Sequence, residues 1–392
     1  MENNNLYVIY NIGEGKGGHS LSMGDTISSL PFVNFNIINI SHFDCVSLKK
    51  LGGDNYHRVT PSINIYSLIV ELHACVNANK PDLIHAFDDF SYTLCRLVNV
   101  IFFSGKLGVL LTKCGGPNPK YNYLYPNPKN IVLFSKENYD WFDNNRNSNL
   151  YLIPNRIKDI AMRKSTDIEN IIDSQYLNIV CISRITPYYE RKILSSIKFV
   201  SDLNNSGFKT SLTIIGSVVS NELYEKVFRI IDDLDYVELF IDEKHTYLAS
   251  EFIHYFDATI STGRGVMESC YMDKITFVPV QNSEYPEILC DDNINDLFSL
   301  NFSERTITPT NSTQNIFNSG NISFNISKGV KDFTNKNFRL SSVQSKYKEL
   351  YDKVYSDENR DFIDLYTIFS TIYFIYRQIT RKISFGFKGK IK

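Results

Sequence analysis

The sequence predicts an α/β protein with two successive Rossmann-like, doubly wound domains, each a mainly parallel sheet with helices on both faces. Apolar strand patterns alternate with segments of helical periodicity, which is typical of parallel sheets. The alternation restarts after a proline and a charged stretch between residues 154 and 173. A chain of 392 residues is long enough for two ordinary domains. Because doubly wound sheets bind ligands at the carboxyl ends of their strands, we expect a ligand cleft between the domains.

The first half of the chain contains patterns for a sheet of five to seven strands. The expected strands cover residues 6–12, 35–40, 81–86, 107–111, 130–134 and 150–153. Helices are expected from about Ser20 and over residues 62–78 and 92–103. In the second half we expect strands at 177–182, 211–215, 237–240, 258–261 and 276–280, and helices at 192–203, 223–234 and 248–256. Residues 301–328 are polar and rich in turn formers, so we expect a long surface excursion there.

Composition excludes several classes of protein. A formal net charge of -2 gives no electrostatic basis for binding nucleic acid, so no such partner is expected. Seven scattered cysteines without a Cys-x-x-Cys pair argue against a disulfide framework or structural zinc and suit a reducing compartment. The polar start at residues 1–5 lacks a signal sequence, and the apolar runs are too short to span a bilayer. We therefore expect a cytoplasmic protein.

The most informative segment covers residues 260–280, which combine a strand end, a glycine turn, a short helix and another strand. Gly263 and Gly265 allow close approach to a ligand, and the helix that follows presents its N-terminal amides to an anion. Arg264 adds a cation there, and Glu268 lies one turn further on the same side. This arrangement suits a diphosphate and a ribose diol. The alternative is an ordinary αβ turn with a solvated Arg and Glu.

A second loop lies at the corresponding place after the first strand of the second domain. Arg184 follows that strand directly, and Arg191 and Lys192 open the next helix. Any one of these cations is explained equally well as a solvated surface residue. Their convergence with Arg264 at the expected cleft favours anion binding.

The first strand is followed by the glycine loop 13–20. Gly13, Gly15 and Gly18 fit the dinucleotide pattern Gly-x-Gly-x-x-Gly, which makes an NAD(P)-dependent oxidoreductase an alternative function. The acid that this pattern needs about 20 residues on comes late, at Asp44. The same glycines, with Gly17, could instead admit a sugar to the backbone, with His19 lining the cleft or serving only as a solvated residue.

Together these motifs resemble retaining glycosyltransferases of the GT-B fold, family 4, of the polysaccharide-biosynthesis type. The resemblance covers about residues 6–300 and rests on these segments: Ser183-Arg184, Arg191-Lys192, Gly263-Arg264 and Glu268, with Gly17-Gly18-His19-Ser20, 81–85, 134–135 and 153–155 in the first half. It implies transfer of a sugar from a nucleotide-diphosphate donor to a hydroxyl, with retention, without a metal or cofactor and without a protein nucleophile. The implied acceptor is a saccharide, expected to be lipid-linked.

The resemblance also implies residue roles and domain roles. Catalytic roles are expected for Arg184, Lys192 and His19. Donor contacts are expected from Gly17, Gly18, Arg191, Gly263, Arg264, Gly265, Val266 and Glu268, and Lys113, Cys114 and Asn118 are expected near the sugar or acceptor. Residues 1–157 would form the acceptor domain, 158–356 the nucleotide-sugar domain, and 357–392 a helix that packs back on the first domain, with a basic tail.

The sequence departs from the family pattern at two places. Ile260 stands where the family has the first glutamate of a Glu-x7-Glu pair, and Asp273 stands where a glycine usually precedes the last strand. The missing carboxylate leaves open a catalytically silent relative that acts as a binding or assembly subunit. Asp233 and Asp235 form an Asp-x-Asp pair, but they lie between a helix and a strand, away from the expected cleft. We interpret them as solvated acids and expect no metal.

The C-terminal segment has the spacing of an amphipathic helix, with apolar residues at 362, 365, 366, 369, 372, 373 and 376. Residues 377–392 contain Arg377, Arg381, Lys382, Lys388, Lys390 and Lys392 and no acid. We expect this basic end either to touch an anionic membrane from the cytoplasmic side or to be a plain solvated tail.

Overall fold

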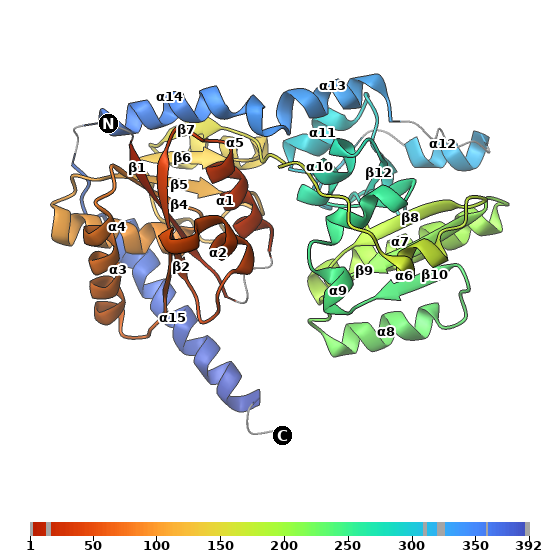
Figure 1. Cartoon of the computed structure of the whole chain (residues 1–392), viewed down its shortest axis with the longest axis horizontal. Coiled ribbons are helices and arrows are strands. Elements are labelled where there is room, and N and C mark those ends of the chain that lie inside the picture. Colours follow the sequence, from red (N-terminus) through yellow and green to blue (C-terminus); the bar gives the residue numbers. More distant parts are fainter. Residues whose placement is uncertain (1–2, 13–16, 309–311, 320–325, 358–359, 389–392) are drawn as a thin grey trace. The chain divides into compact units, whose positions relative to one another are not determined.

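The chain divides by its internal contacts into two compact units, which are described separately. Unit 1 is Met1–Arg156 with Val343–Lys392, and unit 2 is Ile157–Ser342. The computed structural model (Figure 1) describes residues 3–12, 17–308, 312–319, 326–357 and 360–388, without the side chains of residues 312, 318, 319 and 382–388. Gly13 and Gly15 of the dinucleotide-like pattern lie outside the described residues. Each unit is an α/β sandwich around one sheet, which confirms the predicted fold class.

Unit 1 contains a parallel sheet of seven strands in the order β3-β2-β1-β4-β5-β6-β7. Its strands are β1 (Asn4–Tyr10), β2 (Asn34–Ile40), β3 (Tyr56–Val59), β4 (Leu83–Ala86), β5 (Gly108–Lys113), β6 (Asn130–Leu133) and β7 (Asn149–Leu152). Its helices are α1 (Gly18–Ser28), α2 (Val46–Gly52), α3 (Ile65–Asn79), α4 (Asp89–Phe103), α5 (Lys136–Asn145), α14 (Gln344–Tyr355) and α15 (Leu365–Lys388), with 3-10 turns η1 (Gly53–Asn55) and η2 (Asn122–Leu124). Strand β3 was not predicted, because its four residues are too few for a clear alternating pattern.

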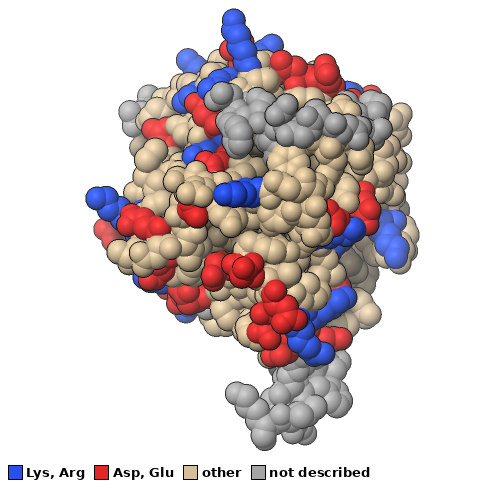
Figure 2. All heavy atoms as spheres, turned by 90° about the vertical axis from the view of Figure 1, so that its right-hand side faces the viewer, with Lys and Arg blue, Asp and Glu red and all other residues tan. Residues whose placement is uncertain are grey.

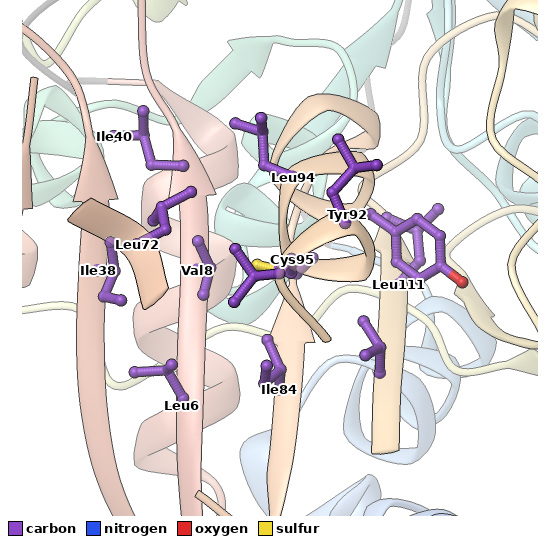
Figure 3. Close-up of a cluster of buried hydrophobic side chains, with 14 of the residues drawn as sticks. Leu6, Val8, Ile38, Ile40, Leu72, Ile84, Tyr92, Leu94, Cys95 and Leu111 are labelled. Carbon is purple, nitrogen blue, oxygen red and sulfur yellow. The ribbon is translucent and has the colours of Figure 1, made fainter. Parts of the chain in front are cut away.

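The two faces of this sheet are buried by different helices because side chains alternate along each strand. Leu6 and Val8 of β1 point to the same side as Ile84 of β4 and pack under α3 and α4, as Figure 3 shows. Tyr7 and Ile9 point to the opposite side and pack under α1 and α2. Burying an aliphatic side chain of this size contributes about 1.5–3 kcal/mol to folding.

Helix α14 packs in unit 1, which corrects the expected domain boundary at residue 356. Tyr347, Leu350, Tyr351 and Val354 of α14 are buried against residues of β4, β5 and β6. These side chains recur at helical spacing. They bury the part of this sheet face that α1 and α2 leave uncovered. The second unit therefore ends at Ser342, before this helix begins.

A buried polar network connects α14 to the middle of the sheet. The Tyr351 hydroxyl lies 2.9 Å from His85 Nδ1 and 3.1 Å from the Tyr7 hydroxyl, and His85 Nε2 lies 2.7 Å from Thr112 Oγ1. Burial, with a smaller effect from the Arg156 guanidinium, holds the pKa of His85 well below its usual value, so the ring is neutral. A neutral imidazole can donate from one nitrogen and accept at the other, which this pair of hydroxyls satisfies.

The Arg156 guanidinium is fully buried and lies between two aromatic rings. Its central carbon is 5.2 Å from the Phe134 ring centroid and 5.0 Å from that of Tyr347, and Nη2 donates to the carbonyl oxygen of Ser22 at 3.2 Å. Cation–π contact offsets part of the cost of taking the charge out of water. Arg156 thereby fixes the position of the chain at the end of the first of the two segments that form unit 1.

Unit 2 contains a sheet of six strands in the order β10-β9-β8-β11-β12-β13, in which only the β12–β13 pair is antiparallel. Its strands are β8 (Leu177–Ile182), β9 (Thr210–Ile215), β10 (Val237–Phe240), β11 (Ala258–Ile260), β12 (Ile275–Val278) and β13 (Glu287–Ile288). Its helices are α6 (Thr166–Ile171), α7 (Glu190–Asn205), α8 (Asn221–Ile231), α9 (Glu243–Thr246), α10 (Arg264–Tyr271), α11 (Ile294–Ser299), α12 (Ser312–Ser319) and α13 (Lys328–Asn337), with 3-10 turns η3 (Pro187–Tyr189), η4 (Ala249–Tyr255) and η5 (Leu340–Ser342).

The segment 301–328 is not simply a surface excursion, as the sequence analysis expected. Phe302 is fully buried, and Ile316 of α12 joins the core formed by α7, α8 and the sheet. Thr313 is buried as well, and its hydroxyl donates to the carbonyl oxygen of Pro286 at 2.7 Å. The prediction failed because a few well-placed apolar residues anchor a segment whose average composition is polar.

Charge is mixed over the surface in the view of Figure 2, where acidic and basic side chains are interspersed with uncharged ones. Among the described helices, none combines the length and the apolar character needed to cross a membrane. The seven cysteines are free thiols.

We predict that Tyr351→Phe lowers the free energy of unfolding of unit 1 by about 1–3 kcal/mol, because it leaves His85 Nδ1 without its buried partner and removes the bond between the Tyr7 and Tyr351 hydroxyls. Urea unfolding followed by circular dichroism would measure this change. The matched control is Tyr66→Phe on the exposed face of α3, where the side chain is 73% exposed and loss of the hydroxyl should change stability by less than about 0.5 kcal/mol. Equal effects of the two substitutions would contradict a structural role for the network.

Candidate functional site

The carboxyl ends of β8 and β11 mark the point where the sheet of unit 2 changes direction. From β8 the chain proceeds to β9 and β10 on one side, whereas β11 and β12 lie on the other. Cys181 of β8 pairs with Ile260 of β11, so the loops that follow these two strands leave the sheet as neighbours. In doubly wound sheets this switch point is where ligands bind.

The loop after β8 carries Arg184 into an open pocket of about 360 Å³. The pocket is lined by Arg184, Thr186, Tyr188, Tyr189 and Val219. Arg184 is exposed, its guanidinium carbon lies 5.8 Å from the Tyr189 ring centroid, and among the described residues no carboxylate forms an ion pair with it. A Cβ at Gly216 would lie 1.7 Å from the carbonyl oxygen of Ser183, so glycine is required there for this loop to sit on β9.

The cations at the start of α7 occupy different environments. Lys192 is 3% exposed, and its Nζ donates to the carbonyl oxygen of Ile182 at 2.8 Å, which fixes the ammonium group at the end of β8. Arg191 instead bonds the loop after β12, since its Nη2 donates to the carbonyl oxygens of Val280, Gln281 and Ser283 at 2.6, 3.2 and 3.3 Å. The geometry therefore gives Lys192 a place at the switch point and gives Arg191 a bracing role.

The loop after β11 leads into α10 through Gly263, whose φ of 56° favours glycine. Arg264 and Glu268 form an ion pair, with 2.7 Å between Nε and Oε1, and both side chains are mostly buried. The amides of Gly265 and Val266 lie 3.2 Å from the carbonyl oxygens of Thr262 and Gly263. Val266 is fully buried, so only the backbone of this residue can face a ligand.

A loop that the sequence analysis did not select flanks the same site. Asn301 and Phe302 both have left-handed φ angles, near 54°, and the Phe302 carbonyl oxygen accepts from the Gly263 amide at 3.0 Å. Glu304 follows, with Oε1 buried and without a hydrogen-bond partner. Burial raises the pKa of Glu304, and the nearby charges of Lys192 and Arg191 lower it. No periodicity or motif could have identified this carboxylate, because only the folded loop brings it to Lys192.

Three of the described side-chain oxygens in unit 2 are buried without a hydrogen-bond partner: Ser183 Oγ, Asn301 Oδ1 and Glu304 Oε1. All three belong to the loops that flank the ends of β8 and β11. Buried polar atoms are normally bonded, and exceptions are often explained by a missing ligand or water. This concentration of unbonded oxygens indicates a binding site.

The predicted residues of the glycine loop lie at the start of α1 in unit 1. Gly17 precedes the helix and Gly18 begins it, and a Cβ at either position would meet no atom within 4 Å. Packing therefore does not demand glycine here. His19 is exposed in the first turn of α1. These residues follow β1, at the carboxyl end of the sheet of unit 1.

The residues predicted near the sugar or acceptor follow β5 at the same end of that sheet. Lys113 Nζ donates to the carbonyl oxygens of Gly115 and Pro117 at 2.8 and 3.1 Å, and Asn118 Oδ1 accepts from Asn138 at 2.8 Å. Burial raises the pKa of the Cys114 thiol to about 12, which makes it a poor nucleophile. Lys113 thus bonds its own loop, Asn118 is bonded to α5, and Cys114 packs against the buried clusters of unit 1.

Asp88, which the sequence analysis did not select, lies at the end of the neighbouring strand β4. Its carboxylate caps α4 and accepts from the Tyr10 amide at 2.7 Å and the Ser91 amide at 2.8 Å. Burial and the adjacent Asp89 raise its pKa to about 7, although these backbone bonds oppose the shift. A carboxyl with a pKa near neutrality can exchange a proton under physiological conditions.

The Asp-x-Asp pair lies elsewhere. Asp233 and Asp235 are exposed in the turn that leads into β10, at the amino end of the sheet and opposite the switch point. Within the described part of the chain, no group of three or more potential metal ligands was found.

Comparison with solved structures identifies similar folds over nearly the whole chain. Anabaena HepE in complex with UDP matches with a TM-score of 0.62 and 12% identity, covering 89% of this chain and 100% of that one. A glycosyltransferase from Rickettsia africae matches with a TM-score of 0.62 and 15% identity, covering 91% and 99%. A protein from Listeria monocytogenes that is described as a UDP-N-acetylglucosamine 2-epimerase matches with a TM-score of 0.55 and 11% identity. This match covers 93% of this chain and 100% of the Listeria chain.

At these identities the similarity establishes a shared fold of two Rossmann-like units. No protein-family model and no curated protein sequence matches the chain.

We predict that Glu304→Gln stabilises the protein at neutral pH. Its raised pKa means that ionised Glu304 costs the folded state free energy once the pH exceeds the unfolded value of about 4.5. The amide removes this cost, so the melting temperature should rise at pH 7 and the gain should shrink toward pH 4. The exposed Glu225→Gln on α8 is the matched control and should change little. A lower melting temperature for Glu304→Gln at pH 7 would mean that the carboxylate stabilises the fold instead.

Proposed function

We propose that the protein is a retaining, metal-independent glycosyltransferase that moves a sugar from a nucleotide-diphosphate donor to a hydroxyl of a lipid-linked saccharide acceptor. The observation that carries the proposal is the convergence of Arg184, Lys192 and the N-terminus of α10 at the switch point of unit 2. Fixed cations and the positive end of the α10 helix dipole together suit a diphosphate. The similar fold of Anabaena HepE, which was solved with UDP, supports the nucleotide.

The chemistry requires stabilisation of a leaving group. The bond between the anomeric carbon and the β-phosphate oxygen breaks while the acceptor oxygen bonds to that carbon, and the acceptor proton passes to the departing diphosphate. Negative charge therefore grows on the diphosphate. Arg184 can bond two phosphate oxygens at once, and Lys192 holds a fixed charge away from water. Preorganised charges of this kind usually make the largest contribution to catalysis.

Glu268 is proposed to accept hydrogen bonds from the ribose, while Arg264 holds its carboxylate by the 2.7 Å ion pair and supports the diphosphate. Gly263, Gly265 and the Val266 backbone would contact the donor at the same helix start. Glu304 is proposed to accept hydrogen bonds from hydroxyl groups of the donor sugar, since its Oε1 lacks a partner. Glu304 would thereby supply, from another loop, a carboxylate that Ile260 does not.

The acceptor is proposed to bind unit 1 at the carboxyl end of its sheet. His19, with the Gly17 and Gly18 backbone, follows β1, and Lys113, Cys114 and Asn118 shape the loop after β5. The Asp88 carboxyl, with its pKa of about 7, lies at the end of the strand between β1 and β5. Synthesis of a surface polysaccharide on the cytoplasmic side of a membrane fits such an acceptor.

The alternatives make different demands on the chain. An NAD(P)-dependent oxidoreductase would bind a nicotinamide dinucleotide through the glycine loop and would not need the cations of unit 2. A silent binding subunit, which the missing carboxylate at Ile260 favours, would bind the donor but transfer nothing. A sugar-nucleotide epimerase would convert the donor without an acceptor. Incubation with UDP-sugars, with and without a pool of lipid-linked saccharides, separates these outcomes.

We predict that Arg184→Ala lowers turnover about 10²-fold or more while it weakens donor binding much less, because the guanidinium acts most strongly on the charged leaving group. Arg184→Lys should recover little, since a point charge cannot bond two oxygens in the same plane. Steady-state kinetics with the best UDP-sugar donor would measure both effects. The control is Arg229→Ala, in the last turn of α8 and away from the switch point. Turnover within about twofold of the wild type for Arg184→Ala would remove this residue from catalysis.

Metal independence has a separate test. Transfer should persist in excess EDTA, because Arg184 and Lys192 already supply positive charge to the diphosphate. Loss of activity in EDTA and its return with Mn²⁺ or Mg²⁺ would show that the phosphate partners are assigned incorrectly.

A further inference from the structure

Helix α15 is held on unit 1 by a polar face. Its buried residues include Thr367, Ser370 and Gln378, with Phe374 as the large apolar contact. Ser370 Oγ lies 3.0 Å from Thr93 Oγ1 of α4, and Gln378 donates to the Tyr10 hydroxyl. These bonds fix the rotation of the helix about its axis.

The opposite face of α15 is apolar and exposed. Six residues, which we call the apolar stripe, are between 41% and 67% exposed: Leu365, Ile368, Phe369, Ile372, Tyr376 and Ile379. At 100° per residue they form one band that lies across the helix from Thr367, Ser370 and Phe374. This is the reverse of a helix packed on a protein core, whose apolar face is covered and whose polar face meets water. The sequence predicted that this helix packs on the first domain, but several of its apolar residues are exposed.

The apolar surface continues onto neighbouring segments. Tyr123 of η2 is 53% exposed and its ring makes an edge contact with Phe369 at 6.1 Å, and Tyr121 beside it is 48% exposed. The acids at the start of the helix do not interrupt this surface, because Asp361 and Asp364 pair with the mostly buried Arg96 at 2.9 and 3.2 Å. A contiguous apolar surface of this extent marks an interaction site.

The charge along the helix and the residues after it identifies the kind of partner. Residues 365–392 contain six Lys and Arg residues and no Asp or Glu. All six cations come after residue 376, so the sequence places an apolar stripe beside a basic end. An apolar helix face flanked by cations and by tyrosines is the pattern of a helix that lies in a membrane interface, where anionic headgroups attract the cations.

We propose that the apolar stripe of α15 is a docking surface for an anionic lipid bilayer. Because the polar face is bonded to α4 and Tyr10, only the stripe is available to the acyl region, and the helix lies along the bilayer surface. Arg381 donates to the Tyr10 hydroxyl at 2.7 Å, so the attraction to anionic headgroups is assigned to the four lysines that follow it in the sequence, Lys382, Lys388, Lys390 and Lys392. The proposal is independent of the function of unit 2, since binding requires no nucleotide or acceptor.

The test is co-sedimentation of the full-length protein with vesicles of phosphatidylcholine alone or mixed with phosphatidylglycerol. Binding should be strong with the anionic vesicles, weak with the neutral ones, and reduced by high salt. The triple variant Leu365→Gln, Ile372→Gln, Ile379→Gln should bind at least about tenfold more weakly, as should a variant with Lys382, Lys388, Lys390 and Lys392 replaced by Gln.

A matched control makes the same chemical change on another exposed helix. Phe228→Gln with Ile230→Gln on α8, at 45% and 40% exposure, should leave vesicle binding unchanged. Circular dichroism and melting should show each variant folded. Equal binding to both kinds of vesicle would overturn the assignment to an anionic surface. Absence of vesicle binding, or a dimer in sedimentation velocity that the triple variant abolishes, would overturn the bilayer as the occupant.

Discussion

Parallel pairing of β8 with both β9 and β11 is the constraint on which the candidate site depends. It brings the loops after β8 and β11 to one edge of the sheet as direct neighbours. Both faces of the sheet are covered by packed helices, so polar chemistry is left to that edge. Arg184, Lys192 and the start of α10 come from segments separated by up to 80 residues, and the strand order alone makes them neighbours.

At this edge of the sheet the fold also leaves buried polar atoms without hydrogen bonds, which lowers local stability. In unit 2, Ser183 Oγ, Asn301 Oδ1 and Glu304 Oε1 are buried without partners, and all three flank this edge. In the buried network of unit 1, by contrast, His85 is hydrogen-bonded to both Tyr351 and Thr112. An unbonded buried polar atom costs about 1–3 kcal/mol, which a ligand can return when it binds.

The sequence predicted what depends on local pattern. The strand and helix alternation gave the two-unit α/β class, and the positions of Arg184 and Gly263 after strands placed both loops at the correct edge. It could not predict that the Arg191 guanidinium would donate to backbone carbonyls, or that the Glu304 carboxylate would lie near Lys192, because both depend on tertiary contacts. The same limit applies to α15, where periodicity identified the helix and the apolar stripe but not the face that packs. A sequence pattern locates an amphipathic helix, but which of its faces is buried depends on the segment that it packs against.

The most direct test of the central claim is calorimetric titration of UDP into the full-length protein and its Glu268→Ala variant, with NAD⁺ titrated in parallel. A nucleotide site at the end of β11 predicts that UDP binds the wild type and that the variant binds it more weakly by about 1.5–3 kcal/mol, the value of charge-assisted bonds to the ribose. NAD⁺ should not bind. Binding of NAD⁺ without UDP, or equal affinity of both proteins for UDP, would contradict the account.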